Sequence, residues 1–388
     1  MRRKNRVESL FASQENFKAF ITKSPADIAY LIGITFPYPY QSPFSAALVA
    51  KKGSSSATLI LPVEWECVLK SFTWEGKAKT YSINDGSPEK GFRDALKSVI
   101  DELEICGEKV ALDYSSWTVG EIRFLKESCP EMYIVDLDPI IEERREIKSE
   151  YEIENIQTAA HIADRGIIGA LNHIEGTIGH SSCTLADFLE HVRIHAIEFG
   201  AHSVGHLNIA QGRNGNSWIT PLYDDLILIK EGKTIRVDYT LCYNGCWVSC
   251  SRMFFTGKPG PNTAEAYAKN MALKAFAESM LKPGIRVSDL CEAVRMEAEN
   301  GNIELLYEEG LGYGVGTSEY ERPYLTADNS EVLKTGMVIA LDVKTLGYKD
   351  ELIHSVDIYE LTHGGNRRLS DFRDWNTLYR INGFRSAQ

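Results

Sequence analysis

A glycine-spaced segment in the C-terminal half, residues 309–323, constrains the fold of this chain more than any other stretch. Every second residue from Gly310 to Gly316 is glycine, with Tyr313 between them and Tyr320 shortly after. Glycine has no Cβ and tolerates positive φ, so such a segment lets the backbone pass close to other groups. We therefore expect a loop that lines a functional site and presents phenol side chains to it.

The bulk composition limits the class of protein. A length of 388 residues exceeds what one ordinary hydrophobic core supports, so we expect two domains. A net charge of -12 argues against nucleic acid as a partner, because phosphate binding needs a basic surface. There is no apolar run of about 18 residues and no signal-peptide pattern after Met1. We expect a cytoplasmic protein with no membrane partner.

Three cysteines at a four-residue spacing, Cys242, Cys246 and Cys250, raise the question of a metal site. The pair Asn244–Gly245 between them lies among apolar residues, which is a strong signal for a two-residue β-hairpin. In that hairpin Tyr243 pairs with Cys246, and side chains alternate between the faces of the sheet. Cys246 and Cys250 then face away from Cys242, so we do not expect the three thiols to bind one ion.

The first part of the chain alternates helical and strand-like segments, which predicts a mixed sheet covered by helices. We expect helices over 7–20 and 92–103, and strands over 29–33, 46–50, 57–61 and 109–112. The strands on either side of the turn at 52–55 should form a hairpin. This part is predicted to be a domain of its own, residues 1–138.

The composition changes near residue 140, where a charge-dense stretch leads into a long helical segment. We place a second domain over residues 139–388. Its expected helices are 142–171, 185–199, 263–281 and 287–300, and its expected strands are 226–229, 233–238 and 246–255. Further strands should surround the glycine-spaced segment. The whole chain is predicted to have an α/β (α+β) fold.

Several segments, in their order and spacing, resemble the creatinase/prolidase/methionine-aminopeptidase family, which has the pita-bread fold. They are Ala26–Gly33, Arg144–Ser149, Leu281–Arg286, Leu333–Val338 and the glycine-spaced segment. The resemblance covers nearly the whole chain. It implies a creatinase-like N-terminal domain, a pita-bread C-terminal domain, an Xaa-Pro dipeptidase-like hydrolase ancestry and a homodimer.

Prolidase-like members of this family hold two metal ions with five side chains, namely Asp, Asp, His, Glu and Glu. By the resemblance these positions are Asp238, Ser249, Tyr313, Asp342 and Val356 in this chain. Two hard divalent ions need several carboxylates and an imidazole to offset their charge. Serine and tyrosine are poor neutral ligands, and valine has no donor atom. We therefore expect a degenerate site with no tight divalent metal as cofactor.

The resemblance also indicates which residues surround a ligand. The family's second loop histidine is Tyr320 here, and a substrate-facing arginine is His354, which should point into the site. The candidate catalytic residues are His354, Asp238, Asp342 and Tyr313, and the candidate substrate-binding residues are Ser249, Tyr320, Glu321 and Glu319. Two carboxylates near an imidazole can do acid/base work or bind a ligand. His202 and His206 could approach the site from the preceding strand, but we expect structural roles for both.

Three functions stay open at this point. The first is a non-metallopeptidase homologue that binds a small amino-acid- or amide-like ligand, or a short peptide, in the old site. The second is a metal-independent hydrolase or lyase of a small amide or guanidino compound, which uses the same pocket. The third is a weak single-metal Xaa-Pro aminopeptidase or dipeptidase that relies on Asp238 and Asp342.

Overall fold

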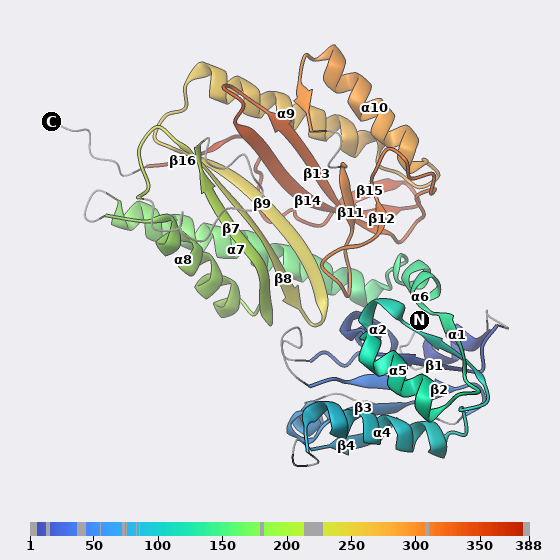
Figure 1. Cartoon of the computed structure of the whole chain (residues 1–388). Coiled ribbons are helices and arrows are strands. Elements are labelled where there is room, and N and C mark those ends of the chain that lie inside the picture. The colour runs from blue at the N-terminus through green and yellow to red at the C-terminus, as the bar shows by residue number, and fades with distance from the viewer. Residues whose placement is uncertain are drawn as a thin grey trace. The chain divides into compact units, whose positions relative to one another are not determined.

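The computed structural model describes most of the chain, and it divides that chain into two compact units, Met1–Arg145 and Glu146–Gln388 (Figure 1). The described residues are 6–12, 16–36, 44–54, 56–71, 74, 76–82, 84, 86–178, 182–212, 228–306 and 310–382. The predicted boundary at 138/139 lies at the first residues of helix α6 (Asp138–Arg145). Within the described ranges, none of the helices has the length and apolar character that a membrane span needs.

The first unit is built on a mixed sheet. Its strands lie in the order β4 (Lys77–Tyr81), β3 (Thr58–Pro62), β2 (Ala47–Lys51), β1 (Ala19–Thr22), β5 (Lys109–Leu112) and β6 (Tyr133–Asp136). The central strands β1, β2 and β3 pair antiparallel, whereas β4, β5 and β6 join in parallel. The predicted mixed sheet and the predicted hairpin of β2 and β3 are confirmed.

Helices supply apolar cover on both faces of this sheet. They are α1 (Arg6–Ala12), α2 (Pro25–Ile32), α3 (Glu66–Ser71), α4 (Pro88–Glu102), α5 (Val119–Ser128) and α6. Neighbouring residues of β1 belong to different cores: Phe20 packs with α1 and α2, and Ile21 packs with α4 and α5. Successive side chains of a strand point to opposite faces, so β1 contributes to both cores. A disulfide joins Cys106 to Cys129 in this unit.

Two predictions for this unit are wrong. The segment 29–33, expected as a strand, is the end of helix α2. Ser24 caps that helix by accepting a hydrogen bond from the Asp27 amide, and Gly33 ends it in the left-handed region at φ 76°. The expected helix over 7–20 ends at Ala12, and β1 begins at Ala19. Short apolar runs fit a buried helix and a buried strand equally well, which explains both errors.

The second unit contains one large sheet whose main path runs β12 (Glu321–Tyr324), β11 (Gly312–Gly314), β13 (Val338–Leu346), β14 (Leu352–Thr362), β9 (Cys246–Thr256), β8 (Thr234–Tyr243) and β7 (Ser203–Gln211). Three short strands pair beside this path: β10 (Glu304–Leu305), β15 (Gly365–Arg368) and β16 (Tyr379–Ile381). Residues 226 and 227 of the predicted strand over 226–229 lie outside the described residues. Leu228 forms only an isolated bridge with Thr184.

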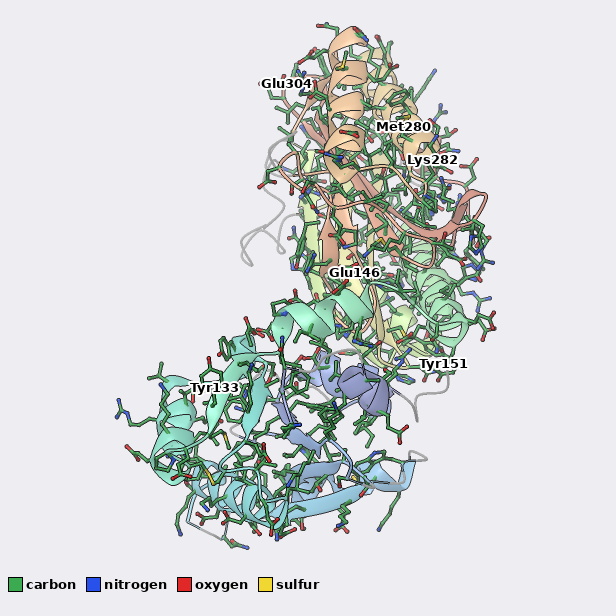
Figure 2. The ribbon with its side chains drawn as sticks, turned by 90° about the vertical axis from the view of Figure 1, so that its right-hand side faces the viewer. Tyr133, Glu146, Tyr151, Met280, Lys282 and Glu304 are labelled. Atoms are coloured by element: carbon green, nitrogen blue, oxygen red, sulfur yellow. A yellow bond between two sulfur atoms is a disulfide. The ribbon has the colours of Figure 1, made fainter. Side chains whose placement is uncertain are left out.

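Two pairs of helices cover this sheet (Figure 1). Helices α7 (Glu150–Thr177) and α8 (Leu185–Glu198) pack against β8 and β9, and helices α9 (Pro261–Met280) and α10 (Val287–Asn300) pack near β13 and β14. Figure 2 marks Glu146, the first residue of this unit, and Met280 at the end of α9. On β8, Val237 and Tyr239 enter the core under α7, so Asp238 between them points to the opposite face.

The hairpin of β8 and β9 has the predicted register. Tyr243 pairs with Cys246, and Asn244 and Gly245 between them both have positive φ, 49° and 76°. Two positive φ angles are typical of the type I′ turn that joins tightly paired strands. Cys246 and Cys250 lie in the core under α7. The register of this hairpin therefore determines which side chains of β8 and β9 point to the sheet face away from α7.

Candidate functional site

A cavity of about 400 Å³ lies on the sheet face away from α7. Strands β7, β8, β9, β11, β13 and β14 all contribute to it. Its lining includes His206, Asp238, Thr240, Ser249, Ser251, Tyr313, Tyr320, Asp342, Lys344, His354 and Val356. These side chains come from residues more than 100 positions apart, so the sheet register decides which of them meet.

One row of paired residues crosses four strands at the floor of the cavity. Asp238 of β8 pairs with Ser251 of β9, Ser251 pairs with Val356 of β14, and Val356 pairs with Asp342 of β13. Paired residues point to the same face of a sheet. The two carboxylates therefore flank a serine and a valine, and all four side chains face the cavity.

The charged side chains of the floor form a continuous series of ion pairs. Arg236 Nε lies 2.7 Å from Asp238 Oδ2, and His354 Nδ1 lies 3.0 Å from Asp238 Oδ1. On the other side of the imidazole, His354 Nε2 lies 2.6 Å from Asp342 Oδ1. Lys344 Nζ lies 3.0 Å from Asp342 Oδ2. Cations and carboxylates thus alternate across the floor, with the imidazole in the middle.

The two contacts of the imidazole differ in detail. Ser251 Oγ donates a hydrogen bond of 2.5 Å to Asp238 Oδ1 and also lies 3.1 Å from His354 Nδ1. The distance between His354 Nε2 and Asp342 Oδ1 is short enough for an ion pair. The angles at these two atoms, however, are not those of a hydrogen bond. His354, Asp238 and Asp342 are all buried. The attraction on the Asp342 side is therefore mainly electrostatic.

Burial and charge act in opposite directions on these groups. Burial alone lowers the pKa of His354, but the carboxylates of Asp342 and Asp238 raise it above its ordinary value. For Asp342, burial favours a higher pKa, whereas His354 and Lys344 lower it to about 2. For Asp238, Arg236 and His354 outweigh burial in the same way and hold the pKa well below its usual range. The two carboxylates are therefore ionised at neutral pH, and their charges favour the protonated form of His354.

The glycine-spaced loop brings two tyrosines to the cavity. The Tyr313 hydroxyl donates a hydrogen bond of 2.9 Å to Ser249 Oγ, and its ring centre lies 4.5 Å from that of Tyr320. Burial, Asp342 and Tyr320 raise the pKa of the Tyr313 hydroxyl well above its ordinary value. At Gly312, where φ is 140°, a Cβ would lie 2.0 Å from the Ala340 carbonyl oxygen. Glycine is required there for the close approach that the sequence predicted.

Six of the eight predicted site residues line the cavity, and two do not. The six are His354, Asp238, Asp342, Tyr313, Ser249 and Tyr320. Glu321 is buried beside the loop, where it forms an ion pair of 3.1 Å with Lys148 and accepts a hydrogen bond from the Ser318 amide. Glu319 accepts a hydrogen bond of 2.9 Å from Thr240 Oγ1. Neither Glu321 nor Glu319 lines the cavity, and both bind side chains or amides around the loop, so a contact of either with a ligand stays a prediction.

Sequence reasoning missed the cavity residue Lys344, and it missed Arg236, which pairs with Asp238 but does not itself line the cavity. Lys344 follows Asp342 by two positions and Arg236 precedes Asp238 by two, so strand alternation places each pair on one face. Strand alternation is the sequence signal from which both residues could have been predicted. His206, expected to be structural, lines the cavity, whereas His202 Nδ1 accepts a hydrogen bond of 3.3 Å from the Asn244 amide.

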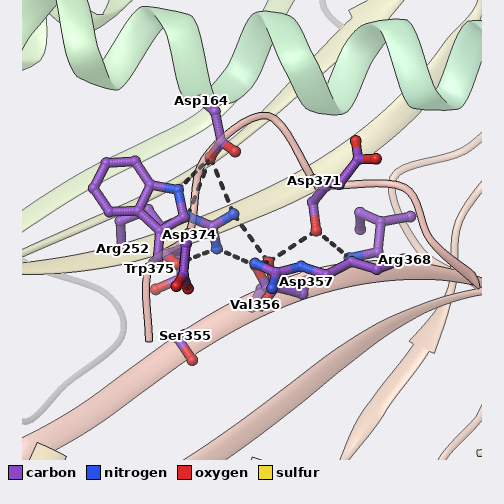
Figure 3. A network of polar contacts seen from close by, with 12 residues as sticks. Asp164, Arg252, Ser355, Val356, Asp357, Arg368, Asp371, Asp374 and Trp375 are labelled. Atoms are coloured by element: carbon purple, nitrogen blue, oxygen red, sulfur yellow. Dashed lines mark hydrogen bonds and ion pairs between the residues drawn. The ribbon is translucent and has the colours of Figure 1, made fainter. Parts of the chain in front are cut away.

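A second ionic cluster lies behind the floor, in the core under α7 (Figure 3). Arg252 Nη2 lies 3.0 Å from Asp164 Oδ1 and 3.0 Å from Asp357 Oδ1. Lys274 also forms an ion pair with Asp357, and the indole of Trp375 donates a hydrogen bond of 3.0 Å to Asp164. Charged groups can be buried when each is paired with an opposite charge, as these are. Asp357 therefore has a structural role that ties α7, α9, β9 and β14 together.

The arrangement of two such units, with a site on the large sheet of the second, is typical of creatinase- and prolidase-like proteins. Residues 3–147 match the creatinase/prolidase N-terminal domain, and residues 154–365, more than half of the chain, match metallopeptidase family M24. The chain belongs to family M24. The family expected from the sequence and its fold class are confirmed.

Individual relatives cover the chain almost completely. The Xaa-Pro dipeptidase of Pyrococcus furiosus is 22% identical over 370 residues, which cover 95% of this chain and 98% of that protein. The crystal structure of a prolidase from Thermococcus sibiricus has a TM-score of 0.81 at 22% identity and covers 98% of this chain and 100% of its own. The N-terminal domain of the FACT complex subunit SPT16 from Cicer arietinum has a TM-score of 0.69 at 14% identity and covers 97% and 96%.

Proposed function

We propose that this chain is a non-metallopeptidase member of family M24 that binds a small amino-acid- or amide-like ligand in the cavity and holds no dinuclear metal centre. The observation that carries the proposal is the position of the His354 imidazole. Its two nitrogens lie 3.0 Å from Asp238 Oδ1 and 2.6 Å from Asp342 Oδ1. The imidazole therefore stands between the two carboxylates that remain of the ligand set implied by the family resemblance.

The chemistry of the other ligand positions supports the same proposal. Val356 offers no donor atom, and Ser249 offers a neutral hydroxyl that already accepts a hydrogen bond from Tyr313. The raised pKa of Tyr313 keeps its phenol protonated, so the phenol is a poor ligand for a hard divalent ion. The residues present do not fit a pair of metal ions.

The remaining carboxylates are also occupied by cations of the protein itself. Arg236 pairs with Asp238 at 2.7 Å, and Lys344 pairs with Asp342 at 3.0 Å. A single divalent ion at these carboxylates would have to displace a buried ion pair and would meet the positive charges it left behind. This competition argues against the weak single-metal peptidase.

A metal-independent hydrolase or lyase is the alternative, and the geometry of His354 favours binding over it. A general base needs a ring nitrogen with a free lone pair. Both nitrogens of His354 face carboxylate oxygens, whose negative charge favours a proton on each nitrogen. A guanidino substrate would need carboxylates to pair with, and both are already paired. Ligand binding without turnover is the simpler use of this site.

The fold itself does not commit the chain to peptide hydrolysis. It occurs in prolidases and also in the N-terminal domain of a FACT complex subunit. Function is carried by the residues of a site and not by the fold that holds them. The site residues therefore decide between the peptidase and the non-peptidase function.

Metal content of the purified protein tests the proposal. The protein is incubated with Mn²⁺, Co²⁺ or Zn²⁺, desalted and analysed by plasma mass spectrometry, and hydrolysis of Xaa-Pro dipeptides is measured on the same samples. We expect metal well below one ion per chain and no hydrolysis. Asp238→Asn is the matched variant. Two ions per chain that disappear in Asp238→Asn, or hydrolysis that disappears with them, overturn the proposal, whereas metal that persists in the variant lies at another site.

A further inference from the structure

We infer that the cavity takes a neutral planar amide, whose carbonyl oxygen accepts a hydrogen bond from Ser249 and whose planar body lies against Tyr313 and Tyr320. This inference rests on the proposed function, because a metal ion at the Ser249 position would take the place of the carbonyl oxygen. It narrows the amino-acid- or amide-like ligand to an uncharged one.

The strand registers divide the polar side chains of the cavity into rows. The row of Ser249 and Thr240 lies next to the row of Asp238 and Asp342, and the basic side chains of the floor lie in the row beyond. Successive rows are two residues apart along each strand, so about 13 Å of backbone separates the first row from the third. A ligand group at Ser249 therefore lies nearer to the carboxylates of the floor than to its cations.

Ser249 offers this part of the cavity a proton that no group of the described chain accepts. Its side chain lines the cavity, is 7% exposed and accepts a hydrogen bond of 2.9 Å from the Tyr313 hydroxyl. Within the described ranges no acceptor for the proton of Ser249 itself is found. A buried donor without an acceptor is costly. A ligand that fills the cavity must therefore bring an acceptor to Ser249.

The charge beside Ser249 disfavours an anionic acceptor. Glu319 accepts a hydrogen bond from Thr240, which pairs with Ser249, and no ion pair to Glu319 is found among the described residues. Burial and, after it, the negative charge of Glu319 raise the pKa of the Tyr320 hydroxyl, so this charge is felt at the loop. A carboxylate at Ser249 would be repelled by Glu319 and would lie one row from the carboxylates of the floor.

A cationic ligand does not satisfy this part of the cavity either. Amidinium and guanidinium groups carry donors only, so they leave the proton of Ser249 without an acceptor. Glu319 does not line the cavity, and Asp238 and Asp342 each contact basic groups of the protein through both oxygens. A cation would have to break those buried ion pairs. The acceptor that fits Ser249 is therefore a neutral carbonyl oxygen.

The shape of the ligand follows from the loop side chains. The rings of Tyr313 and Tyr320 lie 4.5 Å apart between centres and are tilted by 52°. Tyr320 is 42% exposed, so its ring reaches from the cavity to solvent, and Val356 adds an apolar surface to the floor. Aromatic faces of this kind pack well against a planar apolar group. Benzamide has the neutral carbonyl oxygen and the planar body that these side chains fit.

Three molecules of nearly the same shape test the inference: benzamide, benzoate and benzamidine, which are neutral, anionic and cationic. Their binding to the full chain is measured at pH 7, in the presence of a chelator, by nuclear magnetic resonance titration of the ligand signals. We expect benzamide to bind at least about fivefold more tightly than either charged molecule, since only benzamide satisfies Ser249 without repulsion. Equal binding of all three, tighter binding of a charged molecule, or no binding of benzamide overturns the inference.

A charge variant locates the binding. Ser249→Asp keeps an acceptor for Tyr313 but replaces the donor of Ser249 by a carboxylate. Benzamide should then bind at least about fivefold more weakly than to the wild type, and benzamidine should bind more tightly than benzamide. Ser330→Asp makes the same change at an exposed serine and should keep the order of the wild type.

Circular dichroism confirms that each variant is folded. A folded Ser249→Asp variant that keeps the order of the wild type shows the inference to be wrong. If this variant does not fold, the order measured on the wild type decides alone.

The failure of the inference is distinct from the failure of the proposed function. Metal content is measured on the same preparations before the chelator is added, and the spectra also report any benzoate released from benzamide. Two ions per chain, or release of benzoate, contradicts the proposed function. A metal-free and folded preparation without preference for benzamide contradicts the inference alone.

Discussion

The imidazole of His354 lies 2.6 Å from the carboxylate of Asp342, measured from Nε2 to Oδ1. In a family defined by metallopeptidases, this contact puts an imidazole of the protein beside a carboxylate that the family resemblance assigns to metal binding. The contact forms because β13 and β14 pair Lys344 with His354 and Asp342 with Val356. The sheet register itself therefore brings the cations to the carboxylates.

Replacement of His354 should destabilise the fold. His354→Gln leaves two buried carboxylates without the cation between them, and breaking a buried charge pair costs about 3–5 kcal/mol. The free energy of unfolding is measured by urea titration. His363→Gln, at an exposed histidine just after β14, is the matched control and should change stability by less than about 0.5 kcal/mol. A His354 variant as stable as this control would contradict the role given to the imidazole.

The low pKa of Asp342 predicts a specific loss of stability in acid. In the unfolded chain an aspartate titrates near about 3.9, whereas in the folded protein the pKa of Asp342 is lowered to about 2. The ionised carboxylate therefore stabilises the fold fully above about pH 4, and this contribution is lost as the pH falls toward 2.

Asp342→Asn removes this titration. Its free energy of unfolding should fall less steeply than that of the wild type between about pH 4 and pH 2. Urea titrations at several pH values in this window measure both slopes. Identical slopes for the variant and the wild type would show that the carboxylate is not held in its ionised form by His354 and Lys344.

Gly312 lies so close to the Ala340 carbonyl oxygen that adding one methyl group at this position should strongly destabilise the fold. Gly312→Ala places a Cβ against the Ala340 carbonyl oxygen at a φ of 140°, so the loop must move away from β13. We expect a loss of about 2–4 kcal/mol in the free energy of unfolding. Gly364→Ala, where a Cβ meets open space, should be neutral. Thermal unfolding followed by circular dichroism compares the two, and equal stability would refute the constraint.

Metal binding should return when the family's donors are restored. The combined variant Ser249→Asp, Tyr313→His, Val356→Glu and His354→Arg replaces the neutral or apolar groups by ligands and removes the imidazole between the carboxylates. We expect Mn²⁺ to bind at least about tenfold more tightly than to the wild type, as added carboxylate and imidazole ligands imply. Mn²⁺ binding is followed by electron paramagnetic resonance. A folded variant without this gain would contradict the ligand positions assigned by the resemblance.

Strand alternation made much of the site predictable. The hairpin signal at Asn244–Gly245 fixed the register of β8 and β9, and the structure confirms that Asp238 and Ser249 share a face. The same rule placed His354 toward the site, where it is found. Period-two alternation is a rigid property of strands, so these predictions needed only the correct register.

Other parts of the site could not be predicted from alternation. Glu321 follows the loop that carries the tyrosines, yet its carboxylate turns inward to Lys148, which lies far earlier in the sequence. Such a contact depends on the path of the chain in three dimensions. The ion pairs of Lys344 and Arg236 depend likewise on side-chain rotamers, which a strand pattern does not specify. The helix at 29–32 was misread because a four-residue apolar run has no distinguishing period.

The ionic cluster around Arg252 has a consequence for how the second unit is synthesised. Asp164 lies in the first helix of that unit, and its hydrogen-bond donor Trp375 follows it by 211 residues. A ribosome that has made only the chain up to β9 has produced Asp164 and Arg252 but neither Asp357 nor Trp375. The buried charges become satisfied only when the last strands emerge. A nascent chain that stops before Asp357 therefore leaves Arg252 with one of its two acidic partners, Asp164.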